Sequence, residues 1–353
     1  YDEWNTAETA PMTIASGLAD DSPGGYDLHD NPSCLVDSVT RHLVVAYCGH
    51  EDTRMRVRVS VNSIDSDPLL TGGFGSEQVL NLGASFYTYP TLIQLRGVAG
   101  SPIFLFYRDM TNNSPPTTAR LAFSTSTDGG ATWAAQTRIL TGAANLTPYW
   151  EIGSDWSTRI DVAITNTSPN GSTQTISHFY ISGGLYYKSD GTQITATLPF
   201  ATSDCTSVLG TGHASFPGGI VSPASMIYMV VGSSDYAVKA ARFRSGSWVT
   251  TTILASVGGT PAANAFLPGC ALDPFDENLV WAGVKSGSFY ELYRYVSSDD
   301  GATWVETAVT SGSSEDQFFV EPVTFGSGIK AMWLNGAYTG DTNYSFGIRL
   351  YRG

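Results

Sequence analysis

Short apolar runs recur along this chain, separated by glycine, serine and other polar turn residues. Six of them follow one plan, in which a proline-led segment is followed by a turn and a second apolar run. Runs of this length between turn signals predict β-strands rather than helices. We expect each proline to open a first strand, because a strand's first residue need not donate to the ladder. The prolines are Pro32, Pro90, Pro148, Pro217, Pro268 and Pro322.

The second runs are "HLVVAYC", "PIFLFYR", "RIDVAIT", "SMIYMVV", "NLVWAGV" and "IKAMWL", and a third and often a fourth strand follow. Four antiparallel strands repeated radially form a β-propeller. We therefore predict an all-β fold, a single propeller domain over residues 1–353 with six blades, seven being the alternative count. The last unit is short, so residues 1–26 are expected to help close the ring, with "PMTIAS" at 11–16 supplying a strand.

One octet occurs twice, as Ser-x-Asp-x-Gly-x-Thr-Trp at 126–133 and again at 297–304. Both copies fall in the predicted turn between a third and a fourth strand. Asp and Ser side chains there can bind turn amides, and Trp can fill the space between sheets. The octet is similar to the Asp box of sialidase-like propellers, and "YKSDGTQI" at 187–194 is a worn copy. We assign it a structural role, carried by Asp128, Trp133, Asp299 and Trp304.

The composition limits the classes of partner that the protein can have. The net charge of −14 argues against a nucleic-acid binder, and no apolar run is long enough to span a membrane. The chain starts at Tyr1 without Met, which we interpret as a processed segment of a secreted or extracellular protein. The four cysteines fit no paired metal spacing. Cys34 and Cys48 are expected to oppose each other on neighbouring strands, as a disulfide or as two thiols. The oligomeric state stays open.

Strand direction locates the candidate chemistry. Residues that precede a first strand or follow a second strand emerge at one end of a propeller, opposite to the Asp boxes. Histidines, tyrosines and an arginine gathered there form a plausible acid/base and anion-neutralising set. Each also has a plainer explanation, such as a capped loop, a surface histidine or packing between blades. The residues are His29, His50, Tyr87, Tyr89, Arg108, Tyr149, His213, Asp316 and Glu321. His178 and His42 we interpret as structural.

The runs "HDNPSCLVD", "TYPTLIQL…IFLFYRD" and "STDGGATW" resemble the neuraminidase-repeat propellers that include the ulvan lyases. The similarity covers nearly the whole chain after residue 26. It implies β-elimination on a uronic-acid polysaccharide, in which His or Tyr takes the C5 proton and a tyrosine protonates the leaving oxygen. Arg and a second His neutralise the carboxylate.

Carried over by motif, the resemblance assigns catalysis to His29, His50, Tyr89 and Arg108. It assigns a substrate-facing role to Tyr149. By their strand positions, Tyr87, His213 and Glu321 are expected to bind substrate as well. The implied partner is an anionic polysaccharide. No cofactor is required for catalysis, while a structural calcium or zinc ion stays open.

Two other functions compete with the lyase. One is a non-catalytic glycan-binding propeller of an adhesin or phage tail. The other is a sialidase-like glycoside hydrolase, although the Arg-Ile-Pro segment of sialidases is missing; "RID" at 159–161 and "RIL" at 138–140 lie elsewhere.

Overall fold

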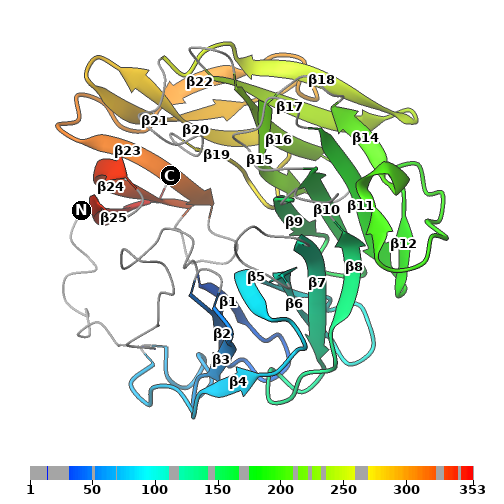
Figure 1. Ribbon diagram of the computed structural model, residues 1–353. Helices are drawn as coiled ribbons and strands as arrows, with labels where there is room; N and C mark the ends of the chain where they lie inside the picture. Colours follow the sequence, from blue (N-terminus) through cyan, green and yellow to red (C-terminus); the bar gives the residue numbers. More distant parts are fainter. Residues whose placement is uncertain are drawn as a thin grey trace. The chain divides into compact units, whose positions relative to one another are not determined.

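The computed structural model is built almost wholly from β-strands (Figure 1). Its only helix within the described residues is one 3-10 turn, Thr202–Asp204. In this part of the chain no helix is long and apolar enough to cross a membrane. The structure describes residues 14, 32–49, 52–68, 70–110, 119–141, 148–166, 175–209, 214–221, 225–231, 236–258, 269–322, 330–340 and 343–352.

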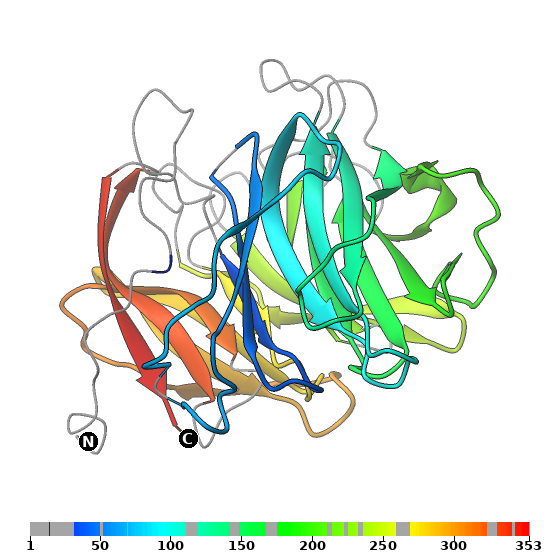
Figure 2. The same ribbon diagram turned by 90° about the horizontal axis from the view of Figure 1, so that it is seen from below.

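The chain divides into two compact units, Tyr1–Ile139 and Leu140–Gly353. The first unit holds two antiparallel sheets, blades one and two, whose facing strands stand side by side in Figure 2. Blade one is β1 (Ser33–Val36), β2 (Leu43–Tyr47), β3 (Met55–Val59) and β4 (Gln78–Leu80). Blade two is β5 (Phe86–Gln94), β6 (Ile103–Met110), β7 (Ala119–Ser126) and β8 (Thr137–Thr141), the last of which crosses the division.

The second unit holds four more sheets. Blade three is β9 (Trp150–Ser154), β10 (Arg159–Thr165), β11 (Ile176–Ser182) and β12 (Leu185–Tyr187), with β14 (Thr206–Leu209) also on β11. Blade four is β15 (Ala214–Val221), β16 (Ser225–Val231), β17 (Tyr236–Arg244) and β18 (Ser247–Leu254). Blade five is β19 (Cys270–Leu272), β20 (Leu279–Ser286), β21 (Phe289–Val296) and β22 (Val305–Ala308). Blade six is β23 (Asp316–Pro322), β24 (Ala331–Gly340) and β25 (Asn343–Tyr351). One further short strand, β13 (Phe200–Ala201), pairs in parallel with the end of β8.

The predicted fold class is confirmed: the chain is an all-β, six-bladed propeller of antiparallel four-stranded blades. Among the described residues the sixth sheet has three strands. The segment predicted to complete it, residues 11–16, lies outside the described residues except for Ile14. Closure by that segment stays a prediction.

Neighbouring blades of the second unit meet through their first strands, and one glycine permits the closest approach. β9 contacts β15, β15 contacts β19, and β19 contacts β23. A Cβ placed on Gly153 of β9 would lie 2.0 Å from the carbonyl oxygen of Ile220 on β15. Real Cβ atoms do not approach an oxygen so closely, so only glycine fits between these two backbones.

The prolines do not all begin strands, as the sequence led us to expect. Pro32 and Pro148 do precede β1 and β9. Pro90 and Pro217 lie inside β5 and β15 at irregularities of the ladder, and Pro322 is the last residue of β23. A bulge, like the first position of a strand, leaves a residue without a ladder partner. Proline, which lacks an N–H, is therefore tolerated there. The remaining proline, Pro268, lies outside the described residues.

The expected opposition of Cys34 and Cys48 is wrong. Cys34 pairs with Val45, and β2 ends at Tyr47, one residue before Cys48. The turn between the strands is centred between Val39 and Thr40 instead of near residue 41, and Arg41 within it adopts a left-handed conformation (φ 62°). All four cysteines of the chain are free thiols.

Both Asp boxes form the same local hydrogen-bond set. In the first, the hydroxyl of Ser126 donates to Asp128 (2.8 Å), and the backbone amide of Thr132 donates to the same carboxylate (2.9 Å). The Thr132 hydroxyl adds a third bond at 2.5 Å. The box centred on Asp299 repeats these bonds at 2.9, 2.8 and 2.6 Å. In the worn copy, Asp190 keeps a bond from its Thr192 amide.

The tryptophans of the boxes lie less deeply than the expected full burial. Trp133 and Trp304 are partly buried, and each packs against the hydrophobic core shared by two neighbouring blades. Their rings therefore seal the edge of the core, with one side reached by solvent.

Asp128→Ala removes all three bonds that organise the first box, so it should lower the free energy of unfolding by about 1–2 kcal/mol. Chemical denaturation followed by tryptophan fluorescence measures this change. Asp190→Ala is the matched control, because that carboxylate makes fewer bonds, and it should have a clearly smaller effect. Equal effects of the two substitutions would contradict the structural assignment of the box.

Candidate functional site

Tyr89 lies on a bulge of β5 in the first unit. Thr88 pairs with Arg108 and Thr91 pairs with Phe106, so Tyr89 and Pro90 together span one position of β6. Tyr89 takes the left-handed conformation (φ 59°), which is uncommon for a bulky side chain. A bulge of this kind redirects a side chain out of the regular alternation of the strand. The backbone therefore aims Tyr89 in a direction that a regular strand would not allow.

Arg108 accompanies Tyr89. It lies within β6, where the sequence placed it just beyond a second strand, and it is 2% exposed. Its guanidinium carbon is 4.6 Å from the centre of the Tyr89 ring. A buried guanidinium against a phenol ring combines a fixed positive charge with a proton-carrying hydroxyl. Among the predicted site residues that the structure describes, Tyr89 and Arg108 are brought into direct contact.

Asp109, the residue after Arg108 on β6, lies close to two other arginines. Asp109 is fully buried and accepts a hydrogen bond from Arg138, with Arg120 3.9 Å away. These two arginines place positive charge beside the buried carboxylate.

Tyr87, predicted to contact the substrate, also makes structural contacts. It is 1% exposed, and its hydroxyl accepts bonds from the amides of Leu82 (3.1 Å) and Ala84 (3.2 Å). Its ring packs edge-on against Tyr107 at 5.4 Å. Burial raises the pKa of Tyr87. These contacts fix the turn before β5, so we leave Tyr87 out of the proposed site.

Two carboxylic acids stand on first strands of the second unit. Glu321 lies on β23 after an irregularity at which Phe319 takes a positive φ of 50°, much as Tyr89 does on β5. Glu151 lies on β9 and is half-buried, whereas solvent reaches Glu321. Sequence analysis proposed Glu321 but missed Glu151, although a carboxylate in the otherwise apolar "YWEIG" was a usable signal.

The pKa values of both acids are raised above the ordinary value of a glutamic acid. Although solvent reaches the Glu321 side chain, the surrounding protein removes part of its hydration and raises its pKa to about 7. Burial and then repulsion from Glu321 raise the pKa of Glu151 to about 8. Burial, and to a smaller extent the charge of Glu151, also raise the pKa of the Cys270 thiol on β19. At neutral pH such a pair holds a proton that an ordinary glutamic acid would have lost, which suits a general acid.

Other predicted residues are placed only in part. Tyr149, two residues before Glu151, is half-buried, and its amide donates to the hydroxyl of Thr165 at 3.0 Å. Asp316 accepts a bond from the amide of Tyr290 and so supports a turn. His29, His50 and His213 lie outside the described residues. Within the residues that are described, no cluster of three or more His, Cys, Asp or Glu side chains is suited to a metal ion.

A buried serine–histidine–aspartate cluster in blade three imitates a catalytic triad. His178 bonds to Ser189 at 2.8 Å and to Asp161 at 2.9 Å, and Arg159 pairs with Asp161 at 2.6 Å. His178 and Asp161 are fully buried, and the Ser189 oxygen also accepts the indole N–H of Trp248. Burial lowers the pKa of His178 despite its Asp161 partner. The cluster joins blades three and four and leaves no access for a substrate, in line with the structural role expected of His178.

No protein-family model and no curated protein matches the chain. Among solved structures, it is similar to the NanB sialidase of Streptococcus pneumoniae at 8% identity, over 98% of this chain and 70% of that one, with a TM-score of 0.48. An intramolecular trans-sialidase of Ruminococcus gnavus is 11% identical over 98% of both chains, with a TM-score of 0.46. A protein of unknown function from Dyadobacter fermentans is 12% identical over 92% of this chain and 96% of that one, with a TM-score of 0.45. These values are low, so the fold assignment rests on the six sheets themselves.

The raised pKa of Glu151 predicts a pH dependence of stability. The folded state holds a proton up to a pH of about 8, whereas the unfolded chain releases it near the ordinary value of 4.5. The group therefore contributes stability at low pH that is lost as the pH rises between about 5 and 8. Glu151→Gln should flatten the fall of the melting temperature over this range. Glu315→Gln, at an exposed glutamate, is the control, and it should leave the slope unchanged; a wild-type slope in Glu151→Gln would refute the shift.

Proposed function

We propose that this chain is a carbohydrate-active propeller that cleaves an acidic polysaccharide, and that it does so by β-elimination next to a uronate. The observation that carries the proposal is the contact of Arg108 with Tyr89 at the bulge of β5. An acidic extracellular polysaccharide is then the partner, and a secreted location is expected.

The chemistry requires a cation and a proton carrier at neighbouring positions. The C5 proton of a uronate becomes acidic only when the charge of the adjoining carboxylate is neutralised, and fixed positive charge does this most effectively in a water-poor setting. Arg108 would supply that charge. Tyr89 would exchange the proton, either at C5 or at the leaving O4 oxygen. His29 and His50 are proposed to complete the acid/base set, as the sequence resemblance implies.

Glycoside hydrolysis is a second candidate, and the two acids of the second unit support it. Hydrolases use a pair of carboxyl groups, one of which must be protonated to assist the leaving group. Glu151 and Glu321 interact electrostatically, and their pKa values of about 8 and about 7 keep a proton available at neutral pH. In this alternative the substrate is hydrolysed without formation of a double bond.

The two reactions are distinguished by their products. We expect wild-type protein, offered a panel of uronate polysaccharides, to form an unsaturated product that absorbs in the ultraviolet. Tyr89→Phe, Arg108→Gln and His50→Ala should each reduce its rate by about 10²–10⁴-fold while the fold persists by circular dichroism. Tyr180→Phe is the matched control, because Arg159 lies 3.7 Å over the Tyr180 ring in a pair that has no proposed role. It should retain full turnover.

Other outcomes decide against the lyase. New reducing ends without unsaturation, abolished by Glu321→Gln, would establish the hydrolase. Glycan binding without any cleavage would establish a binding module. Retained lyase activity in both Tyr89→Phe and Arg108→Gln would remove these residues from the site.

A further inference from the structure

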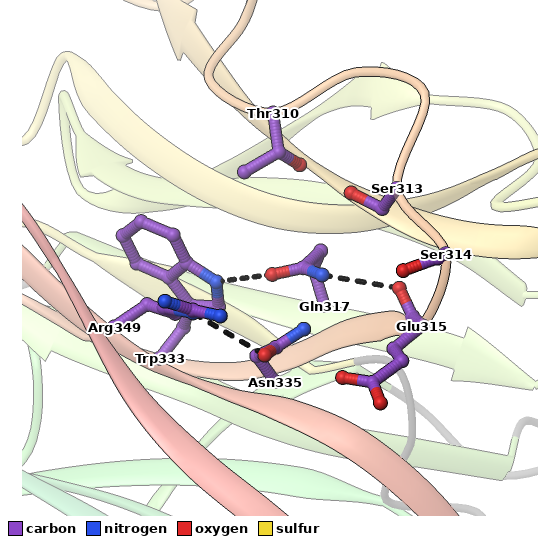
Figure 3. Close-up of a pocket in the computed structure, with 8 residues that line it drawn as sticks. All are labelled: Thr310, Ser313, Ser314, Glu315, Gln317, Trp333, Asn335 and Arg349. Carbon is purple, nitrogen blue, oxygen red and sulfur yellow. Dashed lines mark hydrogen bonds between the residues drawn. The ribbon is translucent and has the colours of Figure 1, made fainter.

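A polar hollow of about 320 Å³ opens on blade six, and Tyr89, Arg108, Glu151 and Glu321 are not among the residues that line it (Figure 3). It lies between the segment that follows β22 and the face of β24 and β25. Trp333 and Asn335 of β24 and Arg349 of β25 form one wall. Ser313 and Glu315, from the segment before β23, form the opposite wall. Ligand pockets usually measure about 300–1,000 Å³, so this hollow is sized for a small ligand such as one sugar unit.

The base of the hollow is rigid. The indole N–H of Trp333 donates to the side-chain oxygen of Gln317 at 2.6 Å. The amide nitrogen of Gln317 then donates to the backbone oxygen of Glu315 at 3.0 Å. Trp333 is 7% exposed and Gln317 4% exposed. A ligand would therefore meet a preformed surface, which reduces the entropy lost on binding.

One wall presents hydrogen-bond donors. The Nε of Arg349 donates to the side-chain oxygen of Asn335 at 3.2 Å, which fixes both groups (Figure 3). In the described part of the chain, the terminal nitrogens of Arg349 and the amide nitrogen of Asn335 make no other hydrogen bond. Arg349 is exposed, so its charge is available to a ligand. A guanidinium with its terminal nitrogens open suits a planar oxyanion such as a carboxylate.

The opposite wall presents acceptors. The hydroxyls of Thr310 and Ser313 both donate to the buried carboxylate of Glu291, at 2.6 and 2.7 Å. The amide of Ser313 donates to it as well, at 2.6 Å. Because these hydroxyl protons are directed to Glu291, the Ser313 oxygen turns lone pairs to other groups. Such an oxygen accepts bonds from the hydroxyls of a sugar.

We propose that this hollow is a second glycan site, which binds a single anionic sugar unit with its oxyanion at Arg349 and its hydroxyls toward Ser313. The choice of a uronate as natural ligand rests on the proposed function, whereas the preference for an anionic sugar rests on the hollow alone. The site would hold one sugar unit of the polysaccharide without taking part in its cleavage. Glu315 stands at the rim as an opposing negative charge, which gives the proposal a sharp test.

The test measures binding of three probes, glucuronic acid, glucose 6-sulfate and glucose, without reference to turnover. The indole N–H signal of Trp333, assigned with Trp333→Phe, reports occupancy of the hollow in nitrogen–proton NMR spectra. Glucuronic acid should shift this signal, and glucose should do so far less. A stronger response to glucose 6-sulfate would identify sulfate as the preferred oxyanion and still support an anionic-sugar site.

Three variants distinguish charge from general disturbance. Arg349→Gln should weaken the binding of glucuronic acid by about tenfold or more, since it removes the paired charge. Glu315→Gln should tighten it by about two- to fivefold, since it removes an exposed like charge. Lys330→Gln, which deletes an exposed positive charge outside the hollow on the same blade, should leave binding unchanged.

The results separate this site from the proposed function. Unchanged binding in Arg349→Gln, an absence of tightening in Glu315→Gln, or equal binding of glucose would each overturn the proposal. Should the protein cleave no polysaccharide but show these three responses, the proposed function fails and the glycan site stands. Arg108→Gln should leave the Trp333 response intact, because Arg108 has no part in this hollow.

Discussion

A four-stranded sheet cannot bury both of its faces alone, and this constraint shapes each unit of the protein. The cores are shared between neighbours. Leu105 of blade two packs with Val44 of blade one, Tyr228 of blade four with Ala163 of blade three, and Trp333 of blade six with Trp281 of blade five. Within each unit, neighbouring blades thus share their cores, and blades four and five each take part in two of them. Polar and reactive side chains are left to the first strands, the turns and the outer faces.

The repeat in the sequence predicted much of this fold, because strand pairs and turns follow from local chemistry. Apolar runs and prolines were enough to locate the blades, and the Asp boxes were placed in the correct turns. The register of strand pairing was harder to predict from the sequence. Cys34 pairs with Val45 across a turn that contains a left-handed Arg41, and neither the centre of this turn nor that conformation is indicated by composition or periodicity. A small shift of the turn is enough to change the expected partner.

The candidate site, too, was predicted from the sequence only in part. Residue type and spacing led to Tyr89 and Arg108, and the two do lie together. The bulge that aims Tyr89 was not foreseen, since proline was taken to mark a strand start and not a defect within a strand. Tyr87 looked equivalent to Tyr89 in "YTY", and in a regular strand the two would share a face. The bulge affects Tyr89 alone, while Tyr87 stays in the core, where its hydroxyl binds backbone amides. The pKa shifts of Glu151 and Glu321 arise from packing between distant segments, which a linear pattern does not encode.

The local bonding of the central Asp-box carboxylates has a consequence for how such a chain can diversify. The side-chain partners of Asp128 described above lie within six residues of it, and the same is true of Asp299. The shape of the turn around each carboxylate therefore depends on few residues elsewhere in the chain. Blade three illustrates the freedom this gives: it retains only a remnant around Asp190, and a buried histidine cluster joins it to its neighbour instead. The Asp-box turn and the surface of a blade can therefore change independently of each other.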